Sequence, residues 1–155
     1  MPMSDQAAAQ RITPYITVDD GDAALRWYAD SLHATETVRY VGDDGRLGHA
    51  QFVVSGATVM LSDAYPEMDV VAATSQQGSS HALHLEVDDC DALHELAVGN
   101  GATSLQPPAD QPHGARQCTI LDPFGHRWML SQTVSAPSHA EIESAMDGFT
   151  VVEGG

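Results

Sequence analysis

The sequence contains no lysine, and its six basic residues are all arginine. Together with 22 acidic residues, they give a formal net charge of −16. A surface of that sign repels nucleic-acid phosphates and anionic lipids, which argues against nucleic-acid or membrane partners bound through a basic patch. The acidic residues are spread along the chain, which indicates a solvated surface. Such a surface suits a salty cytoplasm, where counter-ions screen the repulsion, although a GC-rich genome also replaces lysine with arginine.

Long apolar runs are also missing. No stretch approaches the roughly 18 residues that a membrane-spanning helix needs, and residues 1–10 lack the basic and apolar regions of a secretion signal. We therefore expect a soluble, cytoplasmic protein. The only two cysteines, Cys90 and Cys118, have no metal-binding spacing, so we expect reduced thiols.

The chain is long enough for one domain or two small modules, since it has 155 residues of which 43% are hydrophobic. Residues 11–19 alternate as a strand, and Asp19 or Asp20 is placed to cap a helix that runs to about Leu32. Strands are expected next at 36–41, 47–54 and 57–62, separated by turn residues. On the first strand, alternation places one set of residues on the helix side: Ile12, Pro14, Ile16 and Val18.

The same pattern starts again after a linker at 64–80. We expect a strand at 81–87, a helix from Asp89 to about Val98, a short strand at 102–106, a Pro- and Asp-rich loop, and strands at 116–121 and 127–133. The segment ITVDDGDAALRWY aligns with LEVDDCDALHELA, which indicates an internal repeat. The predicted fold class is therefore α+β, with two tandem βαβββ modules at 11–63 and 81–133. Residues 1–10 and 134–155 are extensions, the second with a short helix at 139–146 capped by Ser138 and Glu141.

The repeat, the Val-Asp-Asp junctions and the segment DPFGHRWML before the final strand are similar to the vicinal oxygen chelate superfamily. That superfamily includes glyoxalase I, bleomycin-resistance proteins, fosfomycin-modifying enzymes and extradiol dioxygenases. The stretches ITPYITVDD, GHAQF and VMLSDAYPE resemble its PhnB-like branch in particular. The resemblance covers residues 12–132 and implies two curved sheets around a cavity, and a homodimer.

Metal-dependent members of the superfamily place one ligand on each of four strands. By register, the matching positions here are Thr13, Met60, Ala82 and Met129. None carries the imidazole or carboxylate that a divalent ion prefers. We therefore expect no metal cofactor at the usual site.

Strand alternation predicts which side chains face the cavity. His49 faces it if Ala50, Phe52 and Val54 pack on the helix. Two thioethers and an aromatic wall suit a small organic ligand. We predict that the ligand-binding residues are Tyr15, His49, Met60, Ser62, Ala82, His84, Glu86 and Met129.

Two functions remain open at this point. The first is binding or sequestration of a small organic molecule, as in bleomycin-resistance proteins. The second is a lyase, isomerase or dioxygenase of glyoxalase type. That enzyme would use a displaced metal site made of His49, His84 and Glu86, or His84 and Glu86 as acid and base.

Overall fold

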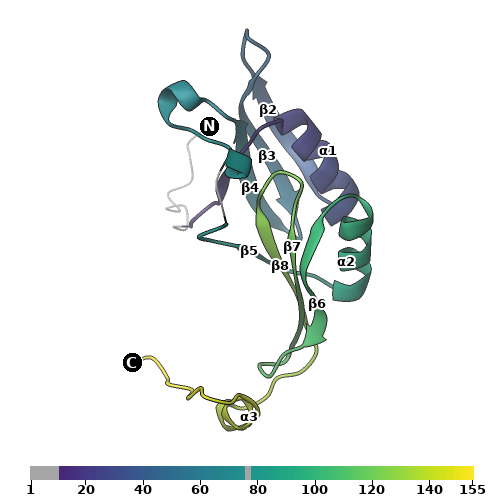
Figure 1. Ribbon diagram of the computed structural model, residues 1–155, viewed down its shortest axis with the longest axis vertical. Helices are drawn as coiled ribbons and strands as arrows, with labels where there is room; N and C mark the ends of the chain where they lie inside the picture. The colour runs from purple at the N-terminus through teal and green to yellow at the C-terminus, as the bar shows by residue number, and fades with distance from the viewer. Residues whose placement is uncertain (1–10, 76–77) are drawn as a thin grey trace, which may run out of the picture.

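The computed structural model describes residues 11–75 and 78–155, and it contains the repeated module twice (Figure 1). The first module consists of β1 (Tyr15–Val18), α1 (Gly21–Leu32), β2 (Thr35–Val41), β3 (Leu47–Val54) and β4 (Ala57–Asp63). The second consists of β5 (Leu83–Glu86), α2 (Cys90–Gly99), β6 (Thr103–Asp110), β7 (Ala115–Leu121) and β8 (Arg127–Thr133). The sheets have the equivalent strand orders β1-β4-β3-β2 and β5-β8-β7-β6, each with one parallel pair. The predicted fold class is confirmed.

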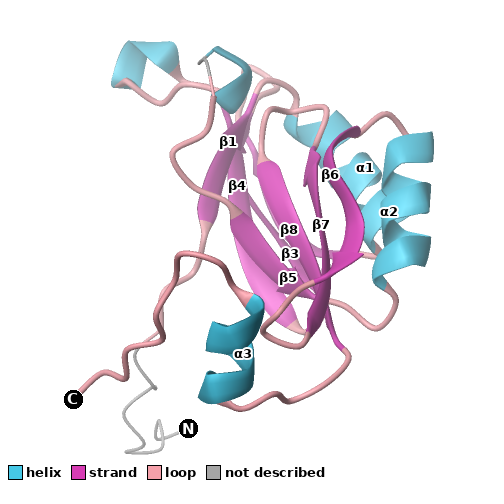
Figure 2. Ribbon diagram, turned by 60° about the horizontal axis from the view of Figure 1, so that its bottom comes forward, coloured by secondary structure: helices cyan, strands magenta, loops and turns pink. Residues whose placement is uncertain are grey.

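The two helices begin in the same way. The Asp20 side chain accepts a hydrogen bond of 3.0 Å from the Ala23 amide, and Asp89 accepts one of 3.0 Å from the Ala92 amide. Each aspartate thus satisfies an amide that has no partner within its helix. The repeated Val-Asp-Asp segment therefore encodes the same strand-to-helix junction in both modules. Both α1 and α2 lie on the same side of the sheets (Figure 2).

Strand alternation sorts the side chains as predicted. On β4, Val59 and Leu61 are buried against the helix side, whereas Met60 between them is only half-buried. On β3, Ala50 and Phe52 are buried against the helix side. His49 alternates with them along the strand and therefore faces the opposite side of the sheet, as predicted. The faces of both sheets that look away from α1 and α2 are called the open faces below.

Two predicted strand boundaries were wrong. The first strand begins at Tyr15 instead of residue 11, and Ile12 is 97% exposed instead of packing on the helix side. β6 continues to Asp110, through the segment that we expected to be a loop. It is an edge strand, and its pairing with β7 skips from Gln106 to Ala109, so Pro107 and Pro108 lie where no ladder hydrogen bond is required.

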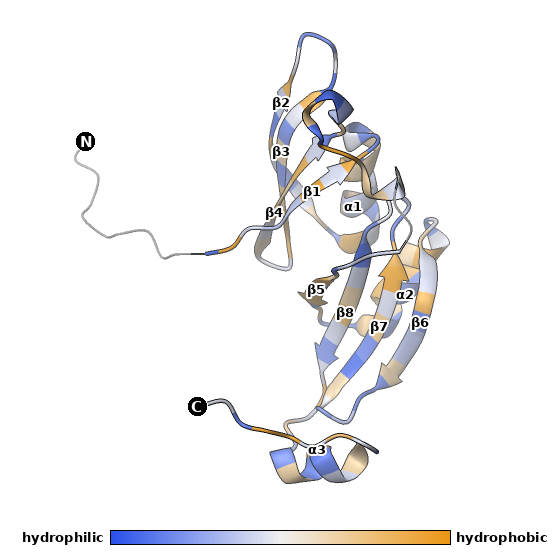
Figure 3. Cartoon of the chain, turned by 60° about the vertical axis from the view of Figure 1, so that its left-hand side comes forward, coloured by the Kyte–Doolittle hydropathy of each residue, from blue (hydrophilic) through white to orange (hydrophobic). Residues whose placement is uncertain are grey.

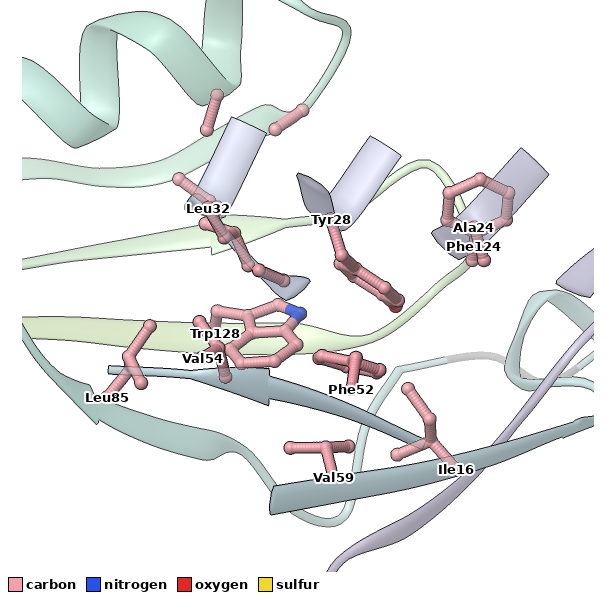
Figure 4. Packing of buried hydrophobic residues seen from close by; sticks show 14 of the residues in the cluster. Ile16, Ala24, Tyr28, Leu32, Phe52, Val54, Val59, Leu85, Phe124 and Trp128 are labelled. Carbon is pink, nitrogen blue, oxygen red and sulfur yellow. The ribbon is translucent and has the colours of Figure 1, made fainter. Parts of the chain in front are cut away.

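The two modules share one hydrophobic core (Figure 4). Tyr28 of α1 stacks on Phe52 of its own module, with ring centroids 4.9 Å apart. The same ring meets Trp128 at 5.6 Å and Phe124 at 6.1 Å, both from the second module. All three partner side chains are buried. Aromatic rings from both halves of the repeat therefore pack around Tyr28.

The turn before β8 contacts the rest of the chain closely. Gly125 has a φ of +86°, and a Cβ built there would lie 2.8 Å from the Thr74 amide nitrogen. The buried His126 ring has its Nε2 2.9 Å from the carbonyl oxygen of Thr17 in β1. The His126 backbone amide donates a turn hydrogen bond of 2.9 Å to Asp122, and the His126 side chain joins the two modules.

The two cysteines, far apart in the sequence, meet in the core. Cys90 begins α2 and Cys118 lies on β7, and their Sγ atoms are 3.4 Å apart. Both residues are free thiols and buried.

The C-terminal segment forms the predicted helix, α3 (His139–Ala145), with the predicted capping box between Ser138 and Glu141. None of its residues is buried, and it lies beyond the end of the second sheet (Figure 3). Among the described residues, no helix is long and apolar enough to cross a membrane.

Candidate functional site

Three polar side chains on the open face of the first sheet form a connected network. The Tyr15 hydroxyl lies 2.8 Å from His49 Nδ1, and the Gln51 amide nitrogen lies 2.9 Å from His49 Nε2. Sheet register explains the arrangement, because Tyr15 and Gln51 both pair with Met60 from opposite sides of β4. The rings of Tyr15 and Tyr40 each have their centroid 5.4 Å from that of His49.

The network is consistent with one arrangement of protons. When the Gln51 carboxamide donates to Nε2, the His49 ring proton is on Nδ1 and is donated to the Tyr15 oxygen. The Tyr15 hydroxyl then donates to the Gly48 carbonyl oxygen, 3.4 Å away. That bond is long, so a ligand acceptor can compete for the same proton. Burial and the nearby Tyr65 raise the pKa of Tyr15, which keeps this hydroxyl protonated at neutral pH.

A short loop forms a wall beside this network. Residues 65–70 close through two backbone hydrogen bonds between Tyr65 and Val70, of 2.8 and 3.2 Å. The Arg46 guanidinium lies 3.9 Å above the Tyr65 ring and forms ion pairs with Glu67 at 2.8 Å and Asp44 at 2.7 Å. These contacts hold the loop against β3.

The loop and the sheet border an open hollow of about 550 Å³, called the first hollow below. A methyl group built on Gly48 would lie 3.6 Å from the Tyr65 hydroxyl, so both phenols reach the same glycine. The hollow is lined by Tyr15, Thr17, Gly48, Ser62, Tyr65, Met68 and Val70. Of the predicted ligand-binding residues, Tyr15 and Ser62 line this hollow. Tyr65, Met68 and Val70 were not among the predicted residues, and they lie in a segment without strand or helix periodicity.

The predicted site residues of the second module lie elsewhere in the single chain. Ala82 and His84 line a hollow of about 430 Å³ between the modules, beside residues 11–14. Glu86 lines a third hollow, beside Ser131. Met60 and Met129 occupy equivalent positions, because Met60 pairs with Tyr15 and Met129 pairs with His84. Tyr15, Ser62, Ala82, His84 and Glu86 are therefore spread over three hollows of one chain, and His49, Met60 and Met129 line none of the three.

The residues present do not fit the metal centre of the superfamily. The four positions that the family resemblance assigns to metal ligands carry a hydroxyl, two thioethers and a methyl group. Within residues 11–75 and 78–155, no three His, Cys, Asp or Glu side chains gather closely enough to hold an ion. The alternative set of His49, His84 and Glu86 therefore does not converge within one chain. The His84 ring is 3.4 Å from the Gln117 amide nitrogen.

Comparison with known proteins agrees with this architecture. The family model of the Glyoxalase/Bleomycin resistance protein/Dioxygenase superfamily matches residues 8–130, and the chain belongs to that superfamily. It is 38% identical, over 138 residues, to an uncharacterized protein of Mycobacterium bovis, covering 87% of this chain and 91% of that one.

Solved structures share the fold. TioX from Micromonospora sp. ML1 has a TM-score of 0.62 at 22% identity, covering 83% of this chain and all of TioX. A Bacillus cereus structure described as a putative 3-demethylubiquinone-9 3-methyltransferase, PhnB protein, has a TM-score of 0.63 at 17% identity. That match covers 80% of this chain and all of the other.

Proposed function

We propose that the protein binds a small, largely planar organic molecule and acts by holding it. The observation that supports this function is the first hollow, where two phenol hydroxyls stand beside an apolar wall. Its volume of about 550 Å³ lies within the range of small-molecule sites. Tyr15 and Tyr65 supply polar anchors, and Met68 supplies a flexible thioether.

The donor chemistry favours binding over metal-assisted catalysis. Thr13, Met60, Ala82 and Met129 occupy the usual metal positions, and none is a good ligand for a divalent ion. The Tyr15–His49–Gln51 network instead orients a hydroxyl toward whatever enters the hollow. A hydroxyl held in place beside an apolar wall can fix the orientation of a bound organic molecule.

We further propose that the functional unit is a homodimer. Tyr40 on the open face of the first sheet is 63% exposed, and Met68 on the neighbouring loop is 70% exposed, which is unusual for large side chains with apolar surface. A second copy would cover these groups, and could bring His84 or Glu86 of its second module toward the first hollow. Light scattering after gel filtration tests this: a mass near 33 kDa, twice the 16.5 kDa of one chain, supports it. A mass near 16.5 kDa at micromolar concentration contradicts it.

Ligand binding can be tested with 1-naphthol, a neutral planar probe with one hydroxyl. We expect NMR titration to show saturable binding that Met68→Ala and Tyr65→Ala weaken about tenfold, the order of one buried apolar contact. The matched control is Met146→Ala, because Met146 ends α3 and does not line the hollow. Equal affinity in Met68→Ala, Tyr65→Ala and Met146→Ala would contradict the proposed site. Chemical conversion of bound probe would instead favour the glyoxalase-type enzyme.

A further inference from the structure

Arg127 differs from most arginines in this chain. Arg26, Arg39, Arg46 and Arg116 each form at least one ion pair with a carboxylate. The Arg127 side chain forms no ion pair and no hydrogen bond with any of the residues that the structure describes. Arg127 as a residue is half-buried, and its guanidinium, with five N–H donors, has no acceptor among the described residues of a chain that carries 22 acidic residues.

The side chain lies in a defined hollow on the second module. Arg127 begins β8 and pairs with Leu121 of β7. The hollow has a volume of about 430 Å³ and is called the arginine hollow below. It is lined by Gly78, Ser79, Leu105, Gln106, Thr119, Leu121 and Arg127. No carboxylate belongs to this lining.

A second donor accompanies the guanidinium. The Thr119 hydroxyl donates a hydrogen bond of 3.2 Å to Oε1 of the Gln106 side chain. This bond orients the Gln106 carboxamide and leaves its NH₂ group as the donor available to a ligand. Leu105 and Leu121 supply apolar surface in the same hollow. The lining therefore combines charged and neutral donors with an apolar wall.

We propose that the arginine hollow binds the oxyanion group of a small organic acid, a carboxylate or a phosphonate. Two guanidinium N–H groups match two oxygens of such an anion, and the Gln106 amide donates to it as well. Leu105 and Leu121 contact the apolar body of the acid. The site is on the second module and does not depend on the first hollow, so it goes beyond the proposed function.

The negative net charge of the chain separates binding at a local site from nonspecific attraction of anions. A chain of net charge −16 repels anions at long range, so general electrostatic attraction cannot draw an acid to the surface. Saturable binding of an organic anion would therefore report contacts within a local site. Replacement of the arginine at that site should weaken the binding at least tenfold, whereas replacement of an arginine elsewhere should not.

The test uses three probes of similar shape: benzoate, phenylphosphonate and the neutral benzamide. We expect at least one anion to bind the full-length protein in calorimetry, with at least tenfold lower affinity in Arg127→Gln. Benzamide should bind more weakly than that anion. Arg26→Gln is the control, because it carries the same net charge and its arginine lies on α1. The tighter of the two anions identifies the class as carboxylate or phosphonate.

Several results would overturn the inference. The first is equal anion affinity in Arg127→Gln and the parent, and the second is an equal loss of affinity in Arg26→Gln. The third is no anion binding at a probe concentration of about 20 mM, which is high enough to detect even a weak site with a dissociation constant in the millimolar range. If Arg127→Gln does not fold, amide shift mapping of the parent protein decides. Perturbed amides at Gln106, Thr119 and Leu121 support the site, and perturbations confined to other regions contradict it.

Discussion

The Tyr28 hydroxyl donates a hydrogen bond of 2.6 Å to Asp122, which joins α1 of the first module to the turn before β8. The same carboxylate oxygen accepts a bond of 2.9 Å from the Trp128 indole. Its other oxygen accepts the amides of Phe124 and His126, at 2.8 and 2.9 Å. A buried carboxylate is costly without partners, and here four donors satisfy it.

Removal of the Tyr28 hydroxyl should therefore destabilise the protein. We expect Tyr28→Phe to lower the free energy of unfolding by about 1–3 kcal/mol, because Asp122 loses a donor in a buried place. Urea unfolding monitored by circular dichroism measures the change. The control is Tyr40→Phe, at an exposed tyrosine, which should stay within about 0.5 kcal/mol of the parent. A Tyr28→Phe variant as stable as Tyr40→Phe would show that the bond contributes nothing.

The same residue should make stability depend on alkaline pH. Burial, and then the negative charge of Asp122, raise the pKa of Tyr28 well above its ordinary value of 10.0. The unfolded chain releases this proton near pH 10 whereas the folded chain retains it, so the free energy of unfolding should fall as pH rises above about 10. Urea titrations at pH 9, 10 and 11 test this. The fall should be smaller in Tyr28→Phe, and an identical fall in both proteins would assign it to other groups.

The two core thiols should be unreactive in the folded state. Burial raises the pKa of Cys90, and burial together with the hydrogen bond that its thiol shares with Cys90 raises the pKa of Cys118 to about 12. Because the thiolate is the reactive form, a disulfide reagent at pH 8 should modify neither cysteine of the native protein. Both should react in denaturing urea. Rapid modification without denaturant would indicate that α2 opens readily from β7.

The turn before β8 should not tolerate a side chain at Gly125. A Cβ there meets the Thr74 amide nitrogen at 2.8 Å in addition to the unfavourable positive φ. Gly148 is a matched control, since its φ is also positive, at +78°, and nothing lies within 4 Å of its Cβ position. We expect Gly125→Ala to lose at least about 1 kcal/mol more stability than Gly148→Ala. Equal losses in urea unfolding would show that residues 73–74 move aside freely.

The sequence predicted the parts of the fold that depend on local pattern. Alternation along β4 placed Val59 and Leu61 on the helix side of the sheet and Met60 on the open face. The two capping aspartates marked the starts of both helices. It did not predict the length of β6, because proline discourages a strand except at an edge, and the edge position is a property of the whole sheet.

The candidate site was predicted less completely. Tyr15 and Ser62 lie in the first hollow, but the loop of residues 65–70 has no periodicity. Its position depends on Arg46, which contacts Tyr65 and Glu67 across the fold. The lack of a carboxylate partner for Arg127 could not be predicted from the sequence, because ion pairing depends on which acidic residues the fold brings near.

The packing of Tyr28 against Phe124 and Trp128 also determines how the chain can be divided. Each half of the repeat has a complete sheet and helix, yet its apolar interior is closed only by the other half. A polypeptide cut within residues 64–80 would give two fragments with matching unprotected surfaces. Each fragment alone should be poorly folded, and together they should reassociate into one particle. The tandem modules are thus a single unit of folding, although their repeated sequence resembles two.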